Sequence, residues 1–318
     1  MTLQEIIQNY DALIVDLWGV IHDGDRLYPG VADTLRVLHE LNKPVLFLSN
    51  APRLSAKAQT NLDRLAIPRN QYLDIVTSGQ VAHDLLARAA NASPLAGEAT
   101  RLNERSEFSR SGEGAVTHAS PTSTAPSPNP LPQGERANIQ RYFYVGPSKD
   151  EDVLADLPNY VKVDEPAEAN FILCTGYEVD GQPHEEIVPL LMQLLHLPML
   201  CINPDMEVVK QDGTQWLCAG AVATEFTQLG GRVAYIGKPF PEVYAVCKLL
   251  LGNLRVLCVG DNPATDIKGA NDAGFDSLLV TSGVLKARYG ADLTHTQARE
   301  ICAIAKVNPT FVLDGFGL

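Results

Sequence analysis

The chain has 318 residues, of which 45% are hydrophobic and 20% charged, and its mean hydropathy is −0.04. These values are typical of a soluble globular protein, and the length favours two domains. The net charge of −13 argues against non-specific binding to nucleic acid or to anionic membrane surfaces, so we expect neither as a partner.

The segments that bear on cellular location predict a cytoplasmic protein. The N-terminal segment has no basic region before its apolar stretch, which Asp16 interrupts, so we expect no export signal. The longest apolar run, over 188–202, contains two prolines and is too short for a bilayer that requires ~20 residues. The six cysteines form no C-x-x-C pair and mostly lie in apolar runs, which is typical of reduced core residues.

Four apolar runs, ALIVD, PVLFLS, VAYIGK and RVLCVGD, each end in a polar residue. These residues are Asp16, Ser49, Lys238 and Asp261. Continuous hydrophobicity is typical of strands that are buried on both faces of a parallel sheet. Helical periodicity lies between the runs, over 31–41, 55–65 and 241–251. The alternation predicts an α/β fold with a doubly wound, Rossmann-like parallel sheet.

Ligands of such sheets bind outside the carboxyl ends of the strands. The polar residues that end the four runs would all lie at this edge. We therefore expect Asp16, Ser49, Lys238 and Asp261 to converge on one site.

The chain between Ser49 and Lys238 is much longer than one crossover connection. It contains three more apolar runs, in RYFYVG, ANFILCTG and PMLCIN, and a helical stretch over 185–197. We expect a second α/β domain inserted into the first. The predicted boundaries assign 1–78 and 203–318 to the first domain and 79–202 to the inserted domain.

Residues 92–138 differ in composition from the rest of the inserted domain. The segment is rich in Ser, Pro, Gly and Thr and has few large apolar side chains. Such a composition cannot form a hydrophobic core, so we expect a disordered insertion.

The motifs DLWGVIHDG, LSNAP, IGKP and VGDNPATDIKGANDAG follow one another, each after an apolar run. As a set they resemble the haloacid dehalogenase-like (HAD) hydrolase superfamily, over nearly the whole chain apart from 92–138. A domain inserted between the second and third motifs resembles the class IIA, C2-capped branch, which includes p-nitrophenyl phosphatase-like and sugar or nucleotide phosphatase-like enzymes. Residues 16–20 resemble an Asp-x-Trp-Gly-Val motif shared by a small subgroup of that branch.

The resemblance implies an aspartyl-phosphate mechanism. Asp16 would be the nucleophile that attacks the phosphoryl group. Lys238 would supply positive charge beside the reacting groups, and Ser49, Asn50 and Lys238 would bind the phosphate oxygens.

The resemblance also implies Mg²⁺ as the cofactor, because this ion prefers oxygen ligands. Its ligands would be the carboxylates of Asp16 and Asp261 and the main-chain carbonyl of Trp18. Asp266 would orient the site without binding the ion.

Trp18 departs from the pattern of the superfamily, whose phosphatases usually have a second aspartate at this position as general acid and base. An indole does not exchange a proton near neutral pH, and loss of such catalysis typically costs ~10²- to 10⁴-fold in rate. Three interpretations stay open. In the first, hydrolysis persists because His22, Asp23 or Asp25 acts as the acid and base, or because the leaving group needs no proton. In the second, the site binds a phosphorylated ligand with slow or no turnover. In the third, Trp18 serves only in packing.

We therefore expect a Mg²⁺-dependent phosphatase whose substrate is a small phosphorylated metabolite, with the cap closing over it. The alternative is a phosphate-ligand binding or regulatory protein on the same scaffold. Asp205 of INPD is a candidate substrate contact, and Gln80, His83 and Tyr177 are weaker candidates. The sequence indicates neither the identity of the substrate nor the oligomeric state.

Overall fold

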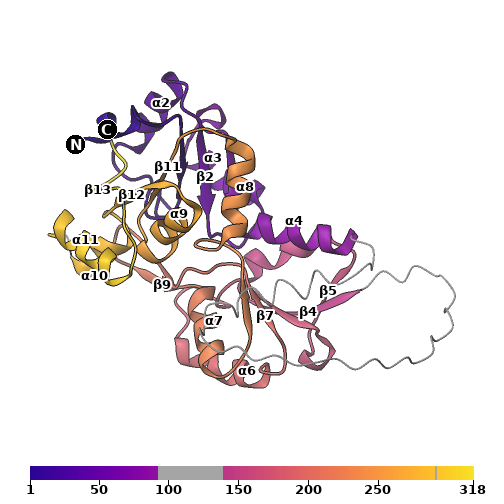
Figure 1. Cartoon of the computed structure of the whole chain (residues 1–318). Helices are drawn as coiled ribbons and strands as arrows, with labels where there is room; N and C mark the ends of the chain where they lie inside the picture. The colour runs from indigo at the N-terminus through magenta and orange to yellow at the C-terminus, as the bar shows by residue number, and fades with distance from the viewer. Residues whose placement is uncertain (92–138, 291) are drawn as a thin grey trace, which may run out of the picture.

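The computed structural model describes residues 1–91, 139–290 and 292–318, and its chain forms two parallel sheets with flanking helices (Figure 1). This architecture confirms the predicted α/β, Rossmann-like fold. The expected disordered insertion, 92–138, lies outside the described residues.

The larger sheet has six parallel strands in the order β13-β12-β11-β1-β2-β3. They are β1 (Ala12–Val15), β2 (Val45–Ser49), β3 (Asp74–Thr77), β11 (Val256–Gly260), β12 (Asp276–Val280) and β13 (Phe311–Leu313). β1, β2 and β11 are buried at every residue, as their continuous apolar runs predict. Because β1 lies between β11 and β2, the carboxyl ends of these three strands are neighbours.

Helices cover both faces of this sheet. They are α1 (Leu3–Ile7), α2 (Val31–Glu40), α3 (Ser55–Arg64), α4 (Ser78–Asn91), α8 (Pro241–Leu251), α9 (Lys268–Ala273), α10 (Val284–Tyr289) and α11 (His295–Ile304), with a 3₁₀ turn at Arg69–Gln71 and a π-helical turn, η5 (Pro263–Ile267). Alternate side chains of one strand enter two different hydrophobic clusters: Phe47 packs with α2 and α3, whereas Leu46 and Leu48 pack with α8. The three helices predicted for this domain are confirmed as α2, α3 and α8.

The second sheet has five parallel strands in the order β10-β7-β6-β4-β5. They are β4 (Gln140–Val145), β5 (Tyr160–Val163), β6 (Phe171–Cys174), β7 (Met199–Cys201) and β10 (Val233–Tyr235). Its helical elements are η2 (Ser148–Leu154), η3 (Pro166–Glu168), η4 (His184–Glu186), α6 (Val188–Gln193) and α7 (Ala219–Gln228). The helix expected over 185–197 is shorter than predicted. α6 begins at Val188, with Pro189 in its first turn, where proline is favoured, and it ends at Gln193.

One strand prediction is wrong. The run VAYIGK was expected in the first sheet, but β10 pairs with β7 at the edge of the second sheet. Its three residues are only partly buried or exposed, so it is a short edge strand rather than a doubly buried one. The chain returns toward the first sheet after it, through Ile236, which packs in a hydrophobic cluster shared by both sheets.

The chain passes between the two sheets near Ser78 and again near Ile202, and these two crossings lie side by side. Ser78 Oγ donates to the carbonyl of Ile202 at 2.5 Å and is 3.0 Å from the carbonyl of Ala51. Between the second crossing and α7 lies an antiparallel hairpin, β8 (Glu207–Val209) and β9 (Gln215–Leu217). The domain boundaries at 78 and 202 stay a prediction. β10 follows the second crossing in sequence but belongs to the second sheet.

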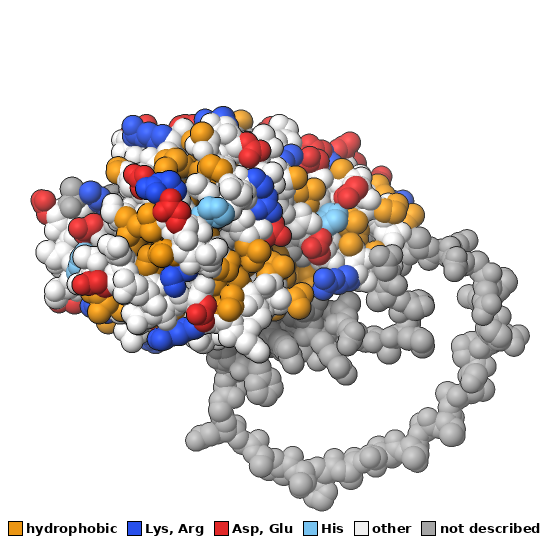
Figure 2. Space-filling view, turned by 90° about the horizontal axis from the view of Figure 1, so that it is seen from above, with side chains coloured by type: hydrophobic (Ala, Val, Ile, Leu, Met, Phe, Trp, Pro, Cys, Tyr) orange, Lys and Arg blue, Asp and Glu red, His pale blue; other side chains and the backbone are white. Residues whose placement is uncertain are grey.

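The described residues contain no helix long and apolar enough to span a membrane. On the face shown in Figure 2, acidic, basic and hydrophobic side chains are interspersed. The described part of this face is therefore not dominated by one sign of charge.

Candidate active site

Residues from three of the predicted motifs meet at a buried ion-pair cluster. Asp16 follows β1 and Asp261 follows β11, so both lie at the carboxyl edge of the first sheet. Lys238 Nζ lies 2.6 Å from Asp16 Oδ1 and 2.7 Å from Asp266 Oδ1. Carboxylate oxygens of the three aspartates all lie within 4.8 Å of one another. The structure thus brings together Asp16, Lys238, Asp261 and Asp266.

Ser49 ends β2 beside this cluster and lines the same cavity as Asp16. The main-chain N–H of Ala51 donates to Ser49 Oγ at 3.2 Å. This bond uses the hydroxyl oxygen as an acceptor, so its hydrogen is left to donate to a bound anion.

Asn50 also lines the cavity, but its side chain is engaged by the protein itself. Asn50 Oδ1 accepts from the main-chain N–H of Lys238 at 2.6 Å, and Asn50 Nδ2 donates to the carbonyl of Lys238 at 3.1 Å. The same amide donates to Asp205 Oδ1 at 3.0 Å. A Cβ on Gly237, whose φ is +135°, would lie 2.7 Å from Asn50 Oδ1. Asn50 therefore positions Lys238 and Asp205.

Asp261 is held by two loops that approach it closely. The main-chain N–H of Val284 donates to Asp261 Oδ2 at 2.7 Å. A Cβ on Gly283 would lie 1.8 Å from that oxygen, and one on Gly19, whose φ is +86°, 2.2 Å from it. Only glycine allows these loops to pack against the carboxylate.

Asp266 reaches the cluster from the π-helical turn η5. The main-chain N–H of Asn262 donates to Asp266 Oδ2 at 3.1 Å, while Oδ1 of the same carboxylate contacts Lys238. Wider turns of this kind occur often at functional sites, because they redirect a side chain out of the helical repeat. The turn thus aims Asp266 back at the cluster.

Negative charge exceeds positive charge in this cluster. Burial raises the pKa of Asp16 well above its ordinary value, despite the attraction of Lys238. Burial and the neighbouring Asp266 raise the pKa of Asp261 to about 7. Burial opposes the charge of Lys238, but the carboxylates of Asp16 and Asp266 outweigh it and raise its pKa. One ammonium group thus faces three carboxylates, and a further cation would relieve their repulsion.

The donor set fits a divalent cation. Three buried carboxylates within 4.8 Å of one another match the oxygen preference of Mg²⁺ or Ca²⁺, and their excess charge favours a doubly charged ion. Trp18 immediately precedes Gly19, which packs on Asp261, so its main chain runs beside the cluster.

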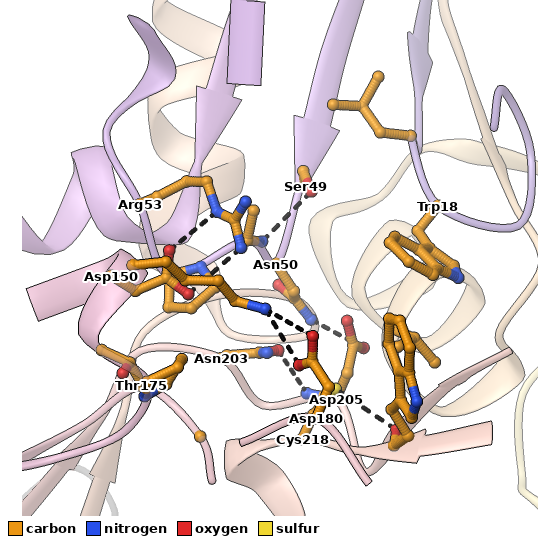
Figure 3. A pocket seen from close by; sticks show the side chains of 18 of the residues that line it. Trp18, Ser49, Asn50, Arg53, Asp150, Thr175, Asp180, Asn203, Asp205 and Cys218 are labelled. Carbon is orange, nitrogen blue, oxygen red and sulfur yellow. Dashed lines mark hydrogen bonds and ion pairs between the residues drawn. The ribbon is translucent and has the colours of Figure 1, made fainter. Parts of the chain in front are cut away.

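A cavity of about 180 Å³ opens beside Asp16 (Figure 3). Its far side is lined by two ion pairs. Arg53, two residues before α3, contacts Asp150 of η2 at 3.1 Å, and this ion pair connects the first domain to the second. Lys149 contacts Asp180 at 2.9 Å. The hairpin contributes Val208, Trp216 and Leu217.

Trp18 lines this cavity as well, and its indole is fixed from two sides. Trp18 Nε1 donates to the carbonyl of Val209 in the hairpin at 2.8 Å. A Cβ on Gly24, whose φ is +95°, would lie 2.7 Å from Trp18 Cη2. Trp18 therefore connects the loop after β1 to the hairpin and forms a wall of the cavity.

His22 is the one of the three proposed acid/base substitutes that lines the cavity. Burial lowers its pKa to about 4, so the imidazole is neutral at pH 7. Its Nδ1 accepts from the main-chain N–H of Gly24 at 3.0 Å. A neutral imidazole whose Nδ1 is an acceptor is a poor acid.

Asp23 and Asp25 instead fasten the loop after β1 to the hairpin. Asp23 accepts main-chain N–H bonds from Asp25, Arg26 and Gln211, and these bonds outweigh burial and lower its pKa. Asp25 is exposed and contacts Lys210 at 2.6 Å. Neither lines the cavity in the described part of the chain.

The remaining candidates divide into two pairs. Asp205 and Tyr177 line the cavity. Gln80 and His83 both contact Asp84 and are not among the described residues that line it.

Sequence reasoning missed Trp216 and the pairs Arg53–Asp150 and Lys149–Asp180. These charge pairs join residues that are 97 and 31 positions apart, which no local pattern indicates. The only available signal was the position of Arg53 directly after the LSNAP motif.

Two family models match the chain. One, described as haloacid dehalogenase-like hydrolase, matches residues 13–105, and the other, described as HAD-hydrolase-like, matches residues 235–317. Apart from Ala12, the first residue of β1, the two matches contain all six strands of the larger sheet.

Single relatives agree with this assignment. A 4-nitrophenylphosphatase from Schizosaccharomyces pombe is 34% identical over 58 residues, which cover 18% of this chain but only 20% of that protein. A glycerol phosphate phosphatase from Mycobacterium tuberculosis, crystallised with magnesium, superposes with a TM-score of 0.61 over 98% of this chain and 76% of that one; at 20% identity it shows the fold alone. The Asp-x-Trp-Gly-Val subgroup stays a prediction.

A hydrolase of the haloacid dehalogenase-like family from Brucella suis 1330 is 28% identical and superposes with a TM-score of 0.70 over 98% of both chains. Together with the two family models, this similarity confirms the predicted superfamily. The chain belongs to the haloacid dehalogenase-like hydrolases.

Proposed function

We propose that the protein is a Mg²⁺-dependent phosphatase that hydrolyses a small phosphorylated metabolite through an aspartyl-phosphate at Asp16. The observation that carries this proposal is the placement of Asp16 between a buried lysine and two further carboxylates, beside a cavity of about 180 Å³. A structural ion pair would not need a third and fourth charge or an adjoining cavity.

Asp16 is the proposed nucleophile. The ammonium group of Lys238 favours the ionised carboxylate, which is the reactive form. Attack on the phosphoryl group forms the Asp16–phosphorus bond and releases the leaving-group oxygen. Water then hydrolyses the aspartyl-phosphate and regenerates Asp16.

The phosphate oxygens would bind to Ser49 and Lys238. The hydroxyl hydrogen of Ser49 is left to donate, and Lys238 already lies 2.6 Å from the nucleophile. Asn50 contributes to the same phosphate site by holding the main chain of Lys238 in place.

Asp16, Asp261 and the main-chain carbonyl of Trp18 would hold Mg²⁺, which when bound would neutralise the charge of the phosphoryl group. Asp266 would hold Lys238 and the loop at Asn262. The buried, glycine-packed position of Asp261 suits a ligand that must not move during turnover.

A phosphatase assay on a broad panel of phosphate esters tests this proposal. The wild type should hydrolyse some of them with Mg²⁺ and lose this activity with a chelator, and Asp16→Asn should reduce it at least ~10²-fold. Asp33→Asn is the matched control, because this exposed carboxylate lies on α2 away from the cavity. Activity that survives Asp16→Asn would rule out the aspartyl-phosphate mechanism.

The second candidate is a phosphate-ligand binding or regulatory protein, and Trp18 is the observation that favours it. If the wild type is inactive on every ester while Trp18→Asp gains Mg²⁺-dependent turnover, the binding function is the better account.

A further inference from the structure

Resting on the proposed phosphatase function, we propose that the substrate is a phosphate ester of an acidic hydroxyl on a flat aromatic or heteroaromatic ring. The ring binds against Trp18 and Trp216, and its oxygen leaves without a proton from the protein. Two independent features of the described residues support this proposal. The indole of Trp18 offers no free N–H beside Asp16, and both tryptophans line the cavity.

The first observation concerns the position that should protonate the leaving group. Trp18 is two residues after Asp16 and lines the same cavity. Its N–H is already donated to Val209 at 2.8 Å, so the indole has no hydrogen-bond donor to offer a departing oxygen.

Among the described residues that line the cavity, His22, Tyr177 and Asp205 are the other side chains to consider as proton donors. His22 is neutral, and its Nδ1 accepts a bond from Gly24. The hydroxyl of Tyr177 lies 2.6 Å from His184 Nδ1 and is held there. Asp205 lies in the same cavity, and burial raises its pKa, but its Oδ1 accepts from Asn50 at 3.0 Å; the Asp205→Asn variant below tests whether it supplies a proton.

The charged groups on the far side are also engaged. Arg53 is paired with Asp150, and Lys149 is paired with Asp180. Figure 3 shows Trp18 across the pocket from the Arg53–Asp150 pair.

The second observation is that both tryptophans of the chain line this cavity, although they lie 198 positions apart in sequence. Trp216 in β9 has Lys210 Nζ 4.4 Å from its ring centre. Trp18 packs against Gly24. Each indole is thus supported by its own segment, and a supported indole is a good surface for stacking a flat ring.

The hairpin is fastened in place, so these walls are held together. Trp18 bonds to Val209, Lys210 contacts Asp25 at 2.6 Å, and the main-chain N–H of Gln211 donates to Asp23 at 3.1 Å. The loop after the nucleophile and the wall that carries Trp216 therefore form one unit.

The chemistry balances without an acid from the protein. Asp16 attacks phosphorus, the bond from phosphorus to the ring oxygen breaks, and the electron pair leaves with that oxygen as an aryl oxide. Water then attacks phosphorus and releases Asp16. The sum is ArO–PO₃²⁻ plus H₂O giving ArO⁻ plus H₂PO₄⁻. An aryl oxide is far more stable than an alkoxide, so an alkyl ester would need the missing acid.

Kinetics with Mg²⁺ give the first test. For the wild type, kcat/KM should increase with the acidity of the phenol in a series of substituted phenyl phosphates. Glycerol phosphate and glucose 6-phosphate should be poorer substrates than 4-nitrophenyl phosphate by ~10²-fold or more. Trp18→Asp should narrow this gap by accelerating the alkyl esters. Equal kcat/KM for alkyl and aryl esters, or a selective loss of alkyl turnover in Asp205→Asn, would overturn the inference.

Binding gives a second test that does not depend on turnover. Because both tryptophans line the cavity, indole fluorescence of the Asp16→Asn variant reports on its occupation. Phenylphosphonate should bind about tenfold more tightly than propylphosphonate, and Trp216→Ala should abolish this preference while inorganic phosphate binds as before. Tyr289→Ala, at an exposed aromatic on α10, is the control.

The outcomes separate the two proposals. Equal affinity for the two phosphonates contradicts the aromatic subsite even if the enzyme is an active phosphatase. Aryl-selective binding without turnover of any ester contradicts the phosphatase proposal and supports the subsite.

Discussion

Lys238 Nζ lies 2.6 Å from Asp16 Oδ1, although the two residues follow strands of different sheets. Asp16 follows the central strand of the first sheet, and Lys238 follows the edge strand of the second. The candidate active site is therefore built where the two sheets meet. It depends on the cross-connections between them, of which the Asn50 side chain is one.

Replacing Lys238 should destabilise the protein, because the buried carboxylates would repel one another. Lys238→Met leaves Asp16 and Asp266 buried without their cation, which typically costs about 3–5 kcal/mol. We expect the free energy of unfolding to fall more at pH 8 than at pH 5, since protonated carboxyls need no partner. Chemical denaturation at both values measures this. Lys286→Met on α10 should have little effect, and an equal loss in both variants would argue against the pairing.

Stability without metal should decrease as the pH rises. Burial and Asp266 raise the pKa of Asp261 to about 7 from 3.8, so the folded state binds this proton more tightly than the unfolded chain. This contribution to the free energy of unfolding is complete below about pH 4 and is lost gradually as the pH rises to about 7. Denaturation curves with a chelator should show the loss, and Asp261→Asn should flatten it.

Added Mg²⁺ should have the opposite pH dependence. The ion competes with protons for the carboxylates, so its stabilising effect should be larger at pH 8 than at pH 5. Thermal unfolding with and without Mg²⁺ gives the comparison. A stabilisation that is equal at the two pH values would show that Mg²⁺ binds away from this cluster.

Gly283, which packs against the carboxylate of Asp261, should be required for Mg²⁺-dependent activity. A Cβ on Gly283 would lie 1.8 Å from Asp261 Oδ2, so Gly283→Ala must displace that carboxylate. We expect Mg²⁺-dependent activity to fall at least ~10²-fold. Gly315→Ala is the control, since its Cβ would meet only Ser282 Oγ at 4.0 Å. Full activity in Gly283→Ala would exclude Asp261 as a ligand held in this position.

The bond from Trp18 to Val209 should hold the hairpin against the loop after β1. Trp18→Phe keeps a ring but loses this bond, which should cost about 1 kcal/mol and speed limited proteolysis within 207–217. Trp216→Phe is the comparison, because Trp216 Nε1 makes no hydrogen bond to the described residues. Equal proteolysis of the two variants would contradict a fastening role for Trp18.

The sequence predicts best what depends on long apolar runs. β1, β2 and β11 are buried at every residue, and their carboxyl ends carry Asp16, Ser49 and Asp261 as expected. β10 was placed in the wrong sheet, because three apolar residues fit either sheet and only pairing with β7 decides between them.

The details of the site depend on contacts that no local pattern contains. Asn50 was predicted to bind phosphate, but its amide lies against Lys238, 188 positions away, and against Asp205. The hairpin β8–β9 was not predicted, since its strands are three residues long and half exposed. Trp18 was identified as unusual from the sequence, yet its bond to Val209 required the fold.

Mass spectrometry of acid-quenched enzyme during turnover of 4-nitrophenyl phosphate with Mg²⁺ tests whether Asp16 is the nucleophile. Because the indole of Trp18, two residues after Asp16, cannot take a proton from water, hydrolysis of the intermediate should be slow enough for it to accumulate. We predict one phosphoryl group on the peptide that contains Asp16, and none in Asp16→Asn. Mg²⁺-dependent turnover with the phosphoryl group on another residue would contradict Asp16 as the nucleophile.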